Sequence, residues 1–178
     1  MKKLLFPVLF MLIATSCATI KVSSDFDKTA SFSAYKTFTF TPDALNLAVD
    51  DLNKTRIITA VENELKLKGF TKADNPDVLI DLKLVAKTIQ TATANTSGGY
   101  GYGYRYRWGG GFTTTTIDYD SYNEGTLFVD MIDAKKLQLV WQGRGVGTIA
   151  ENISAEKREE NIKYAVKMIF EKYPPAVK

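Results

Sequence analysis

The chain of 178 residues contains no histidine and a single cysteine, Cys17. Without histidine the commonest general base of enzymes is missing, and a Ser-His-Asp arrangement is excluded. One cysteine cannot form an intramolecular disulfide, and most zinc sites need several cysteine or histidine ligands. We therefore expect no catalytic residues, no metal and no cofactor.

Acidic and basic residues are nearly balanced once the first 16 residues are set aside. Those residues hold two of the 23 Lys+Arg residues and none of the 20 Asp+Glu residues, which leaves 21 basic and 20 acidic side chains. Such a balance creates no strong field for a polyanion. We expect no nucleic-acid partner.

The N-terminus has the pattern of a bacterial export signal that ends at Cys17. Two lysines are followed by a mostly apolar run over residues 4–13 and then by small residues. The run is shorter than the about 20 apolar residues that span a membrane. Its ending, Ala-Thr-Ser-Cys, resembles a bacterial lipobox, in which the cysteine is acylated and becomes the new N-terminus. We expect residues 1–16 to be removed as a signal peptide and Cys17 to be lipidated.

Acyl chains on Cys17 would hold the protein at a membrane, because two anchoring signals already give stable attachment. Ala18 follows the cysteine, where an aspartate would favour the inner membrane by resemblance to enterobacterial sorting rules. We expect a lipid-anchored protein at the outer membrane, facing the periplasm. Residues 17–24 would form the anchor and a short tether, with a weak edge-strand pattern at Ile20 and Val22.

Two helices are predicted from apolar residues at helical spacing. The first extends over residues 52–68, with Asp50 or Asp51 as its N-cap and Gly69 after its end. The second begins after Ser154, its predicted N-cap. Its buried face is predicted to contain Ile162, Ala165, Val166, Ile169 and Phe170.

The first predicted strands come from β-branched and alternating residues. Residues 35–40 form one strand, and Val78 to Ala86 form another with one buried and one wet face. Asp81 and Lys83 belong to the wet face, and residues 88–95 continue the extended pattern.

The later strands are predicted over residues 113–119 and 127–131, with a turn at 123–125 between them. A turn over residues 133–136 leads to the last strand. Its core face is predicted to contain Leu137, Leu139 and Trp141.

Gly143, Gly145 and Gly147 occupy alternate positions on the face of Trp141. Glycine in a strand marks close approach of another group. Two interpretations remain open, a helix that packs against the bare backbone and a ligand groove.

This order of elements predicts an α+β fold over residues 25–175. We expect a single domain, a two-layer sandwich in which a mostly antiparallel sheet has two amphipathic helices on one face.

A Gly/Tyr-rich loop over residues 98–111 interrupts the predicted strands. Tyrosine, tryptophan and arginine offer stacking faces for a sugar ring or a partner protein, although a connection without a ligand explains the composition too. The candidate binding residues are Tyr100, Tyr102, Tyr104, Arg105, Tyr106, Arg107 and Trp108.

Paired carboxylates are the remaining candidates for chemistry. Asp118 and Asp120 would share one face of a strand, where they could hold a hard cation or belong to a solvated face. Two functions follow. The first is a cell-envelope lipoprotein with a non-catalytic structural or binding role, in contact with an envelope protein or a glycan. The second is a carboxylate-dependent cell-wall glycan hydrolase.

Five short segments occur in a characteristic order along the chain. They are Val22–Asp27, Phe32–Phe38, Pro76–Ile80, Asp133–Gly143 and Tyr173–Pro175. Together they resemble the bacterial lipoprotein family called domain of unknown function 4136. The resemblance covers nearly the whole chain after the signal, and it implies the same anchoring and fold without an established activity. Gln142 replaces the family's usual arginine after the tryptophan.

Overall fold

A computed structural model describes residues 20–98 and 113–175. Over these residues the chain forms one six-stranded sheet with the strand order β1-β6-β5-β4-β2-β3. The strands are β1 (Lys21–Phe26), β2 (Thr37–Phe40), β3 (Thr71–Lys72), β4 (Val78–Gly98), β5 (Thr113–Asp133) and β6 (Gln138–Thr148). The helices are α1 (Pro42–Leu45), α2 (Asp51–Leu67) and α3 (Ala155–Phe170), with a 3-10 turn at Phe32–Ala34.

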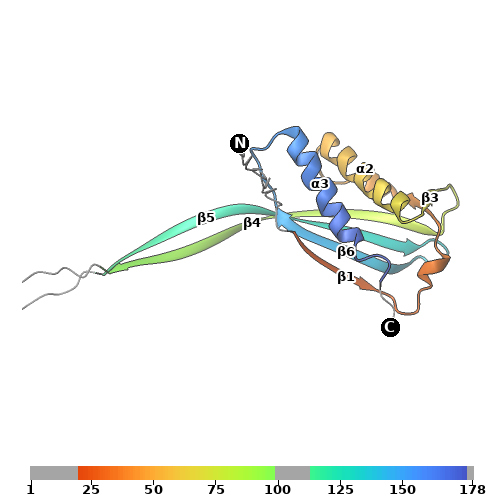
Figure 1. The fold of residues 1–178 in the computed structure, drawn as a ribbon, viewed down its shortest axis with the longest axis horizontal. Coiled ribbons are helices and arrows are strands. Elements are labelled where there is room, and N and C mark those ends of the chain that lie inside the picture. Colours follow the sequence, from red (N-terminus) through yellow and green to blue (C-terminus); the bar gives the residue numbers. More distant parts are fainter. Residues whose placement is uncertain (1–19, 99–112, 176–178) are drawn as a thin grey trace, which may run out of the picture.

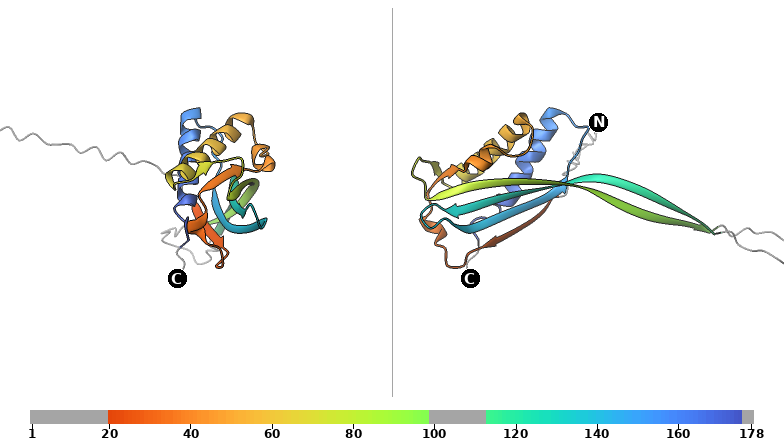
Figure 2. Two further views of the ribbon diagram at one scale, coloured as in Figure 1. Left: turned by 90° about the vertical axis from the view of Figure 1, so that its right-hand side faces the viewer. Right: turned by 180° about the vertical axis from the view of Figure 1, so that it is seen from behind.

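The predicted two-layer α+β sandwich is confirmed. Helices α2 and α3 lie side by side on one face of the sheet, as the views in Figures 1 and 2 show. The β1–β6, β6–β5 and β5–β4 pairs are antiparallel, whereas β4–β2 and β2–β3 are parallel. The sheet is therefore mostly antiparallel.

Both long helices begin at the predicted caps. The Asp50 side chain accepts a hydrogen bond from the Asn53 backbone N–H at 3.0 Å, and the Ser154 hydroxyl accepts one from the Lys157 N–H at 3.2 Å. Helix α2 is followed by Gly69 with φ +87°, a left-handed conformation that favours glycine. The predicted bounds of the first helix are confirmed to within one residue.

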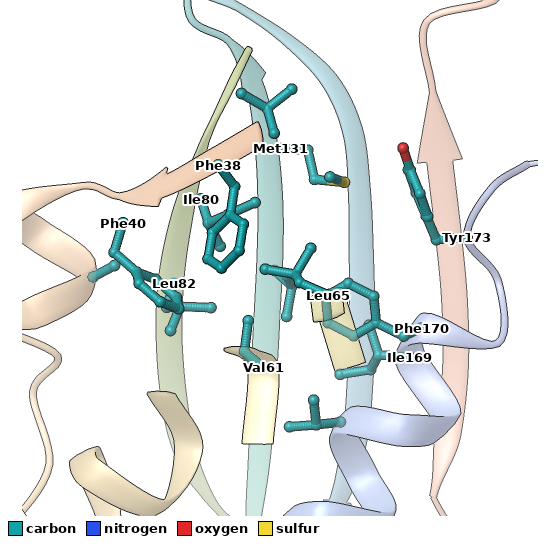
Figure 3. Packing of buried hydrophobic residues seen from close by; sticks show 14 of the residues in the cluster. Phe38, Phe40, Val61, Leu65, Ile80, Leu82, Met131, Ile169, Phe170 and Tyr173 are labelled. Carbon is teal, nitrogen blue, oxygen red and sulfur yellow. The ribbon is translucent and has the colours of Figure 1, made fainter. Parts of the chain in front are cut away.

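The core lies between the two layers. Figure 3 shows Val61 and Leu65 of α2 and Phe170 of α3 turned toward the strands. Trp141 is fully buried beneath them, with its ring centroid 5.9 Å from that of Phe170. Burial of each such side chain contributes about 1.5–3 kcal/mol to folding.

One predicted turn is wrong. Residues 123–125 lie inside β5, which runs without a break from Thr113 to Asp133. Gly125 pairs with Ala86 of β4 on one side and with Gly147 of β6 on the other, so the sheet continues straight through this site. The glycine makes room rather than a turn, because a Cβ there would lie 3.0 Å from the Ile149 Cγ1.

The predicted core face of the last strand is also wrong in part. Leu137 and Leu139 are 72% and 48% exposed, whereas Trp141 is buried. Met131 pairs with Trp141 but Ile132 pairs with Leu139, which leaves Val140 as an extra residue. Such a β-bulge exchanges the two faces of a strand, and sequence alternation alone does not reveal it.

The predicted extended continuation over residues 88–95 is confirmed, and the strands β4 and β5 form a projecting pair there. Eleven consecutive residue pairs, from Thr88–Asn123 to Gly98–Thr113, have no third strand beside them among the described residues. We call these two segments, residues 88–98 and 113–123, the ribbon, and the remainder of the domain the body. Figure 1 shows the ribbon extending well beyond the helical layer.

The body begins at the sheet edge near the base of the ribbon. Strand β1 starts at Lys21, within residues 17–24 that we assigned to the anchor and a short tether. Lys21 pairs with Val146 of β6, close to the point where β6 ends. The chain therefore enters the body at the same end from which the ribbon leaves.

Candidate functional site

The residues that we predicted as sites lie outside the described part of the chain. These residues are Cys17, Tyr100, Tyr102, Tyr104, Arg105, Tyr106, Arg107 and Trp108. The structure does show the elements to which these residues are connected. Residues 99–112 connect the far ends of β4 and β5, and Cys17 precedes the first described residue, Ile20, by three positions.

The ribbon that leads to the Gly/Tyr tract is exposed on both faces. Residues 90–96 of β4 are all exposed, as are residues 115–117 and Ser121 of β5. Neither long helix reaches over these residues (Figure 2). The ribbon therefore holds the ends of the tract away from the core.

The uncovered face of the sheet holds a pair of aspartates that the sequence analysis did not recognise. Asp81 of β4 and Asp130 of β5 are directly paired across the strands and are only 8% and 7% exposed. Asp81 Oδ1 accepts a hydrogen bond from the Thr41 hydroxyl at 2.6 Å, and Asp130 Oδ1 accepts one from Gln142 Nε2 at 2.8 Å. Asp81 was predicted on a wet face, so its burial is a correction.

Lys83 partly neutralises the two carboxylates. Its Nζ lies 3.5 Å from Asp81 Oδ2 and 4.0 Å from Asp130 Oδ2. Burial raises the pKa of Asp130, and the charge of Asp81 adds to that shift, whereas the Gln142 hydrogen bond and Lys83 oppose it. A carboxyl group with a raised pKa can act as a proton donor. No cluster of three or more acidic residues or cysteines suits a metal ion within residues 20–98 and 113–175.

At the opposite end of the sheet, residues from three of the five family-like segments hold the strands together. Asp77 Oδ2 accepts hydrogen bonds from the backbone N–H groups of Lys36 and Thr37 at 2.9 and 3.0 Å. The Tyr35 hydroxyl donates to Asp133 Oδ2 at 3.0 Å. Burial, followed by this contact with Asp133, raises the pKa of Tyr35 to about 12. These motif residues connect β2 with the ends of β4 and β5. Their hydrogen bonds therefore stabilise the fold.

Gly143 and Gly145 pack against α3, as the first of our two interpretations predicted. A Cβ on Gly143 would overlap Ile169 Cγ2, and one on Gly145 would lie 2.9 Å from Ile169 Cδ1. Gly147 differs, because its nearest neighbour is the Ile20 side chain, 3.4 Å from a Cβ built there.

A groove lies beside Gly145 and Gly147, as the second interpretation requires, and a ligand in it stays a prediction. An apolar groove of about 240 Å³ opens here between the sheet and the N-terminal halves of α2 and α3. The sequence signal for it was the alternate glycines, although the contribution of Gly125 from β5 was missed. The lining includes Ile20, Val49, Ile57, Leu84, Leu127, Ile149, Ile153, Ile162 and Ala165, with Asn53, Arg158 and Asn161 as polar members.

Within the described residues, none of the helices has both the length and the hydrophobicity needed to cross a bilayer.

Solved structures with a similar fold share little sequence with this chain. A PDZ domain protein from Parabacteroides distasonis ATCC 8503 matches with a TM-score of 0.50 and 19% identity, over 89% of this chain and 36% of that one. The chain thus spans little more than a third of that protein. A PelC dodecamer from Paraburkholderia phytofirmans matches with a TM-score of 0.45 and 13% identity, over 85% of this chain and 96% of that one.

No curated protein matches the chain. The family comparison does give a match, and it extends from residue 22 to residue 175, which is nearly all of the body and the ribbon. The chain belongs to the family described as domain of unknown function (DUF4136).

Proposed function

We propose that this protein is a cell-envelope lipoprotein, held at the periplasmic side of the outer membrane by acyl chains on Cys17, with a non-catalytic structural or binding role. The observation that carries the role is the ribbon, which projects from a body with its own core. In this proposal the Gly/Tyr tract at its far end is the contact surface for an envelope protein or a glycan.

The exposure of the ribbon supports a role in contact. An isolated two-stranded pair is only marginally stable in water, and three strands or a packed helix are normally needed. The eleven pairs of the ribbon have neither among the described residues. A ribbon of this length contributes little to the stability of the body. Its presence is explained best by a contact made at its far end.

The aromatic residues of the tract indicate the kind of partner. Tyrosine and tryptophan are enriched at protein contacts and stack on sugar rings, and arginine adds cation–π contacts. Both candidate partners, an envelope protein and a glycan, offer such surfaces.

The proposal is tested by replacing residues 99–110 with a short Gly-Ser linker. We expect the free energy of unfolding to change by less than about 1 kcal/mol, the size of a typical point mutation. Photocrosslinking from position 96, an exposed position of β4 close to the tract, should capture a partner in intact cells in the wild type and lose it in the variant. Position 167 on α3 serves as a control site. Equal capture in both proteins would contradict the proposed contact.

The anchor is tested separately. Globomycin, which blocks lipoprotein signal cleavage, should make the wild type accumulate as a precursor, and Cys17→Ser should abolish acylation. Soluble, unacylated wild-type protein would contradict the anchor.

The Asp81–Asp130 pair is the observation that favours the alternative, a carboxylate-dependent glycan hydrolase. Burial raises the pKa of Asp130, the direction that suits a general acid, but one oxygen of each carboxylate already accepts a hydrogen bond from a neighbouring side chain. Turnover of purified peptidoglycan by the wild type and not by Asp130→Asn would favour the hydrolase.

A further inference from the structure

The apolar groove is open because side chains are missing from its floor. Gly125, Gly145 and Gly147 line it from two neighbouring strands, while Ile57 of α2 and Ile162 of α3 form its walls. Its apolar lining favours an apolar occupant over water. The apolar lining and the volume of about 240 Å³ fit part of a hydrocarbon chain.

The chain enters the body at this groove. Ile20 belongs to its lining, and Gly147 faces the Ile20 side chain. Cys17 is three residues earlier, and three residues span at most about 10–11 Å. Whatever path residues 17–19 take, a chain attached to Cys17 starts within reach of the groove.

We propose that the apolar groove binds one acyl chain of the lipidated Cys17. This inference rests on the proposed lipidation. A short tether gives such an intramolecular ligand an effective concentration in the millimolar range, so weak apolar contacts are enough to hold it. The remaining acyl chains stay in the bilayer. The bound acyl chain thereby fixes the orientation of the body relative to the membrane. A flexible tether alone would let the body rotate.

The test uses the full chain in cells that are fed a palmitate analogue carrying a diazirine. After irradiation, the purified protein is digested and analysed by mass spectrometry. We expect the acylated Cys17 peptide to be joined to a peptide from residues 149–165 of the same chain. Gly147→Leu should abolish this product, because the leucine side chain fills the groove. The variant should still fold, because a Cβ at Gly147 meets Ile20 only at an ordinary contact distance of 3.4 Å.

Ala165→Trp fills the groove from the α3 side and should abolish the product as well. This second variant keeps the test possible if Gly147→Leu does not fold. Ala155→Trp is the matched control, since Ala155 is an exposed residue of the same helix. Its product should equal that of the wild type. Melting curves identify variants that have lost their fold.

Three results would overturn the inference. An acylated Cys17 without a product in the groove leaves the anchor intact and removes the bound chain. A phospholipid chain joined to the groove makes a membrane lipid the occupant. An unmodified Cys17 overturns the proposed lipoprotein itself, and the inference with it.

Discussion

The body and the ribbon contain parts of the same two strands, yet only the body has a second layer. In the body, Ile80 and Leu82 of β4 are buried beneath the helices. In the ribbon, residues 90–96 of the same strand are all exposed, although their pairing with β5 continues without a shift. Backbone pairing therefore extends much further than burial does. Stability should reside in the body, and the ribbon should be free to change.

The largest expected effect is in the body, at the contact between α3 and the sheet. Ile169 is fully buried and touches the space above Gly143 and Gly145. We expect Ile169→Ala to lower the free energy of unfolding by about 2–5 kcal/mol, as buried Ile truncations do. Chemical denaturation measures the effect, and the exposed Lys167→Ala on the same helix is the control. Similar losses in both variants would mean that α3 does not hold the sheet in this way.

Overfilling the same contact should have a smaller effect. A Cβ on Gly143 would overlap both Ile169 and Trp141, so Gly143→Ala forces these buried side chains to shift. Overpacking of a core typically costs about 1–3 kcal/mol. Gly147→Ala is the control, because a Cβ there has room. Denaturation midpoints that are equal for the two variants would contradict the packing described for Gly143.

The hydrogen bonds at the end of the sheet should produce a pH dependence. The backbone N–H of Lys36, followed by Thr37, holds the pKa of Asp77 below its ordinary value of 3.8. The lowered pKa means that this carboxylate stabilises the fold above pH about 4. Its contribution is lost as the pH falls through the lowered pKa.

Asp77→Asn should therefore be less stable than the wild type at neutral pH and should lose less stability on acidification. Melting temperatures between neutral pH and about pH 3, below the ordinary carboxyl pKa, measure the difference. The exposed Asp74→Asn is the control. Parallel curves for Asp77→Asn and the wild type would contradict the role of this carboxylate.

The smallest expected effect is in the ribbon. Replacing residues 90–121 with Asn-Gly removes most of it and closes the strands with a favoured hairpin turn. Because none of the residues in that range whose burial the structure describes belongs to the core, we expect the melting temperature of the body to change little. Differential scanning calorimetry measures it. A fall as large as that of Ile169→Ala would show that the ribbon is part of the folding unit.

The sequence pattern predicted correctly those features that depend on residues close together in the chain. It failed for features that depend on the register between neighbouring strands. The caps at Asp50 and Ser154 and the buried face of α3 follow from residues that are neighbours in sequence. The bulge at Val140 depends on which β5 residue opposes each β6 residue, and no local pattern contains that information.

The aspartate pair and the contribution of Gly125 to the groove were hidden for the same reason. Asp81 and Asp130 are 49 positions apart and meet only through the β4–β5 register. Gly125 resembled a turn residue because its partner Gly147 in β6 was not known to lie beside it. Features that one strand supplies alone, such as the alternate glycines of β6, were visible in the sequence, and features that a neighbouring strand contributes were not.

The ribbon and the N-terminal chain leave the body at the same end, and this limits how the body can be oriented relative to a membrane. Eleven residue pairs at about 3.3 Å per residue give the ribbon a reach of roughly 36 Å. The link from Cys17 to Ile20 reaches only about 10–11 Å from the same end of the body. If Cys17 is held in a bilayer, a ribbon that points straight at the membrane must enter it. A ribbon that stays in water must leave the body at an angle to the membrane normal, so anchor length and ribbon length together limit where the tract can meet a partner.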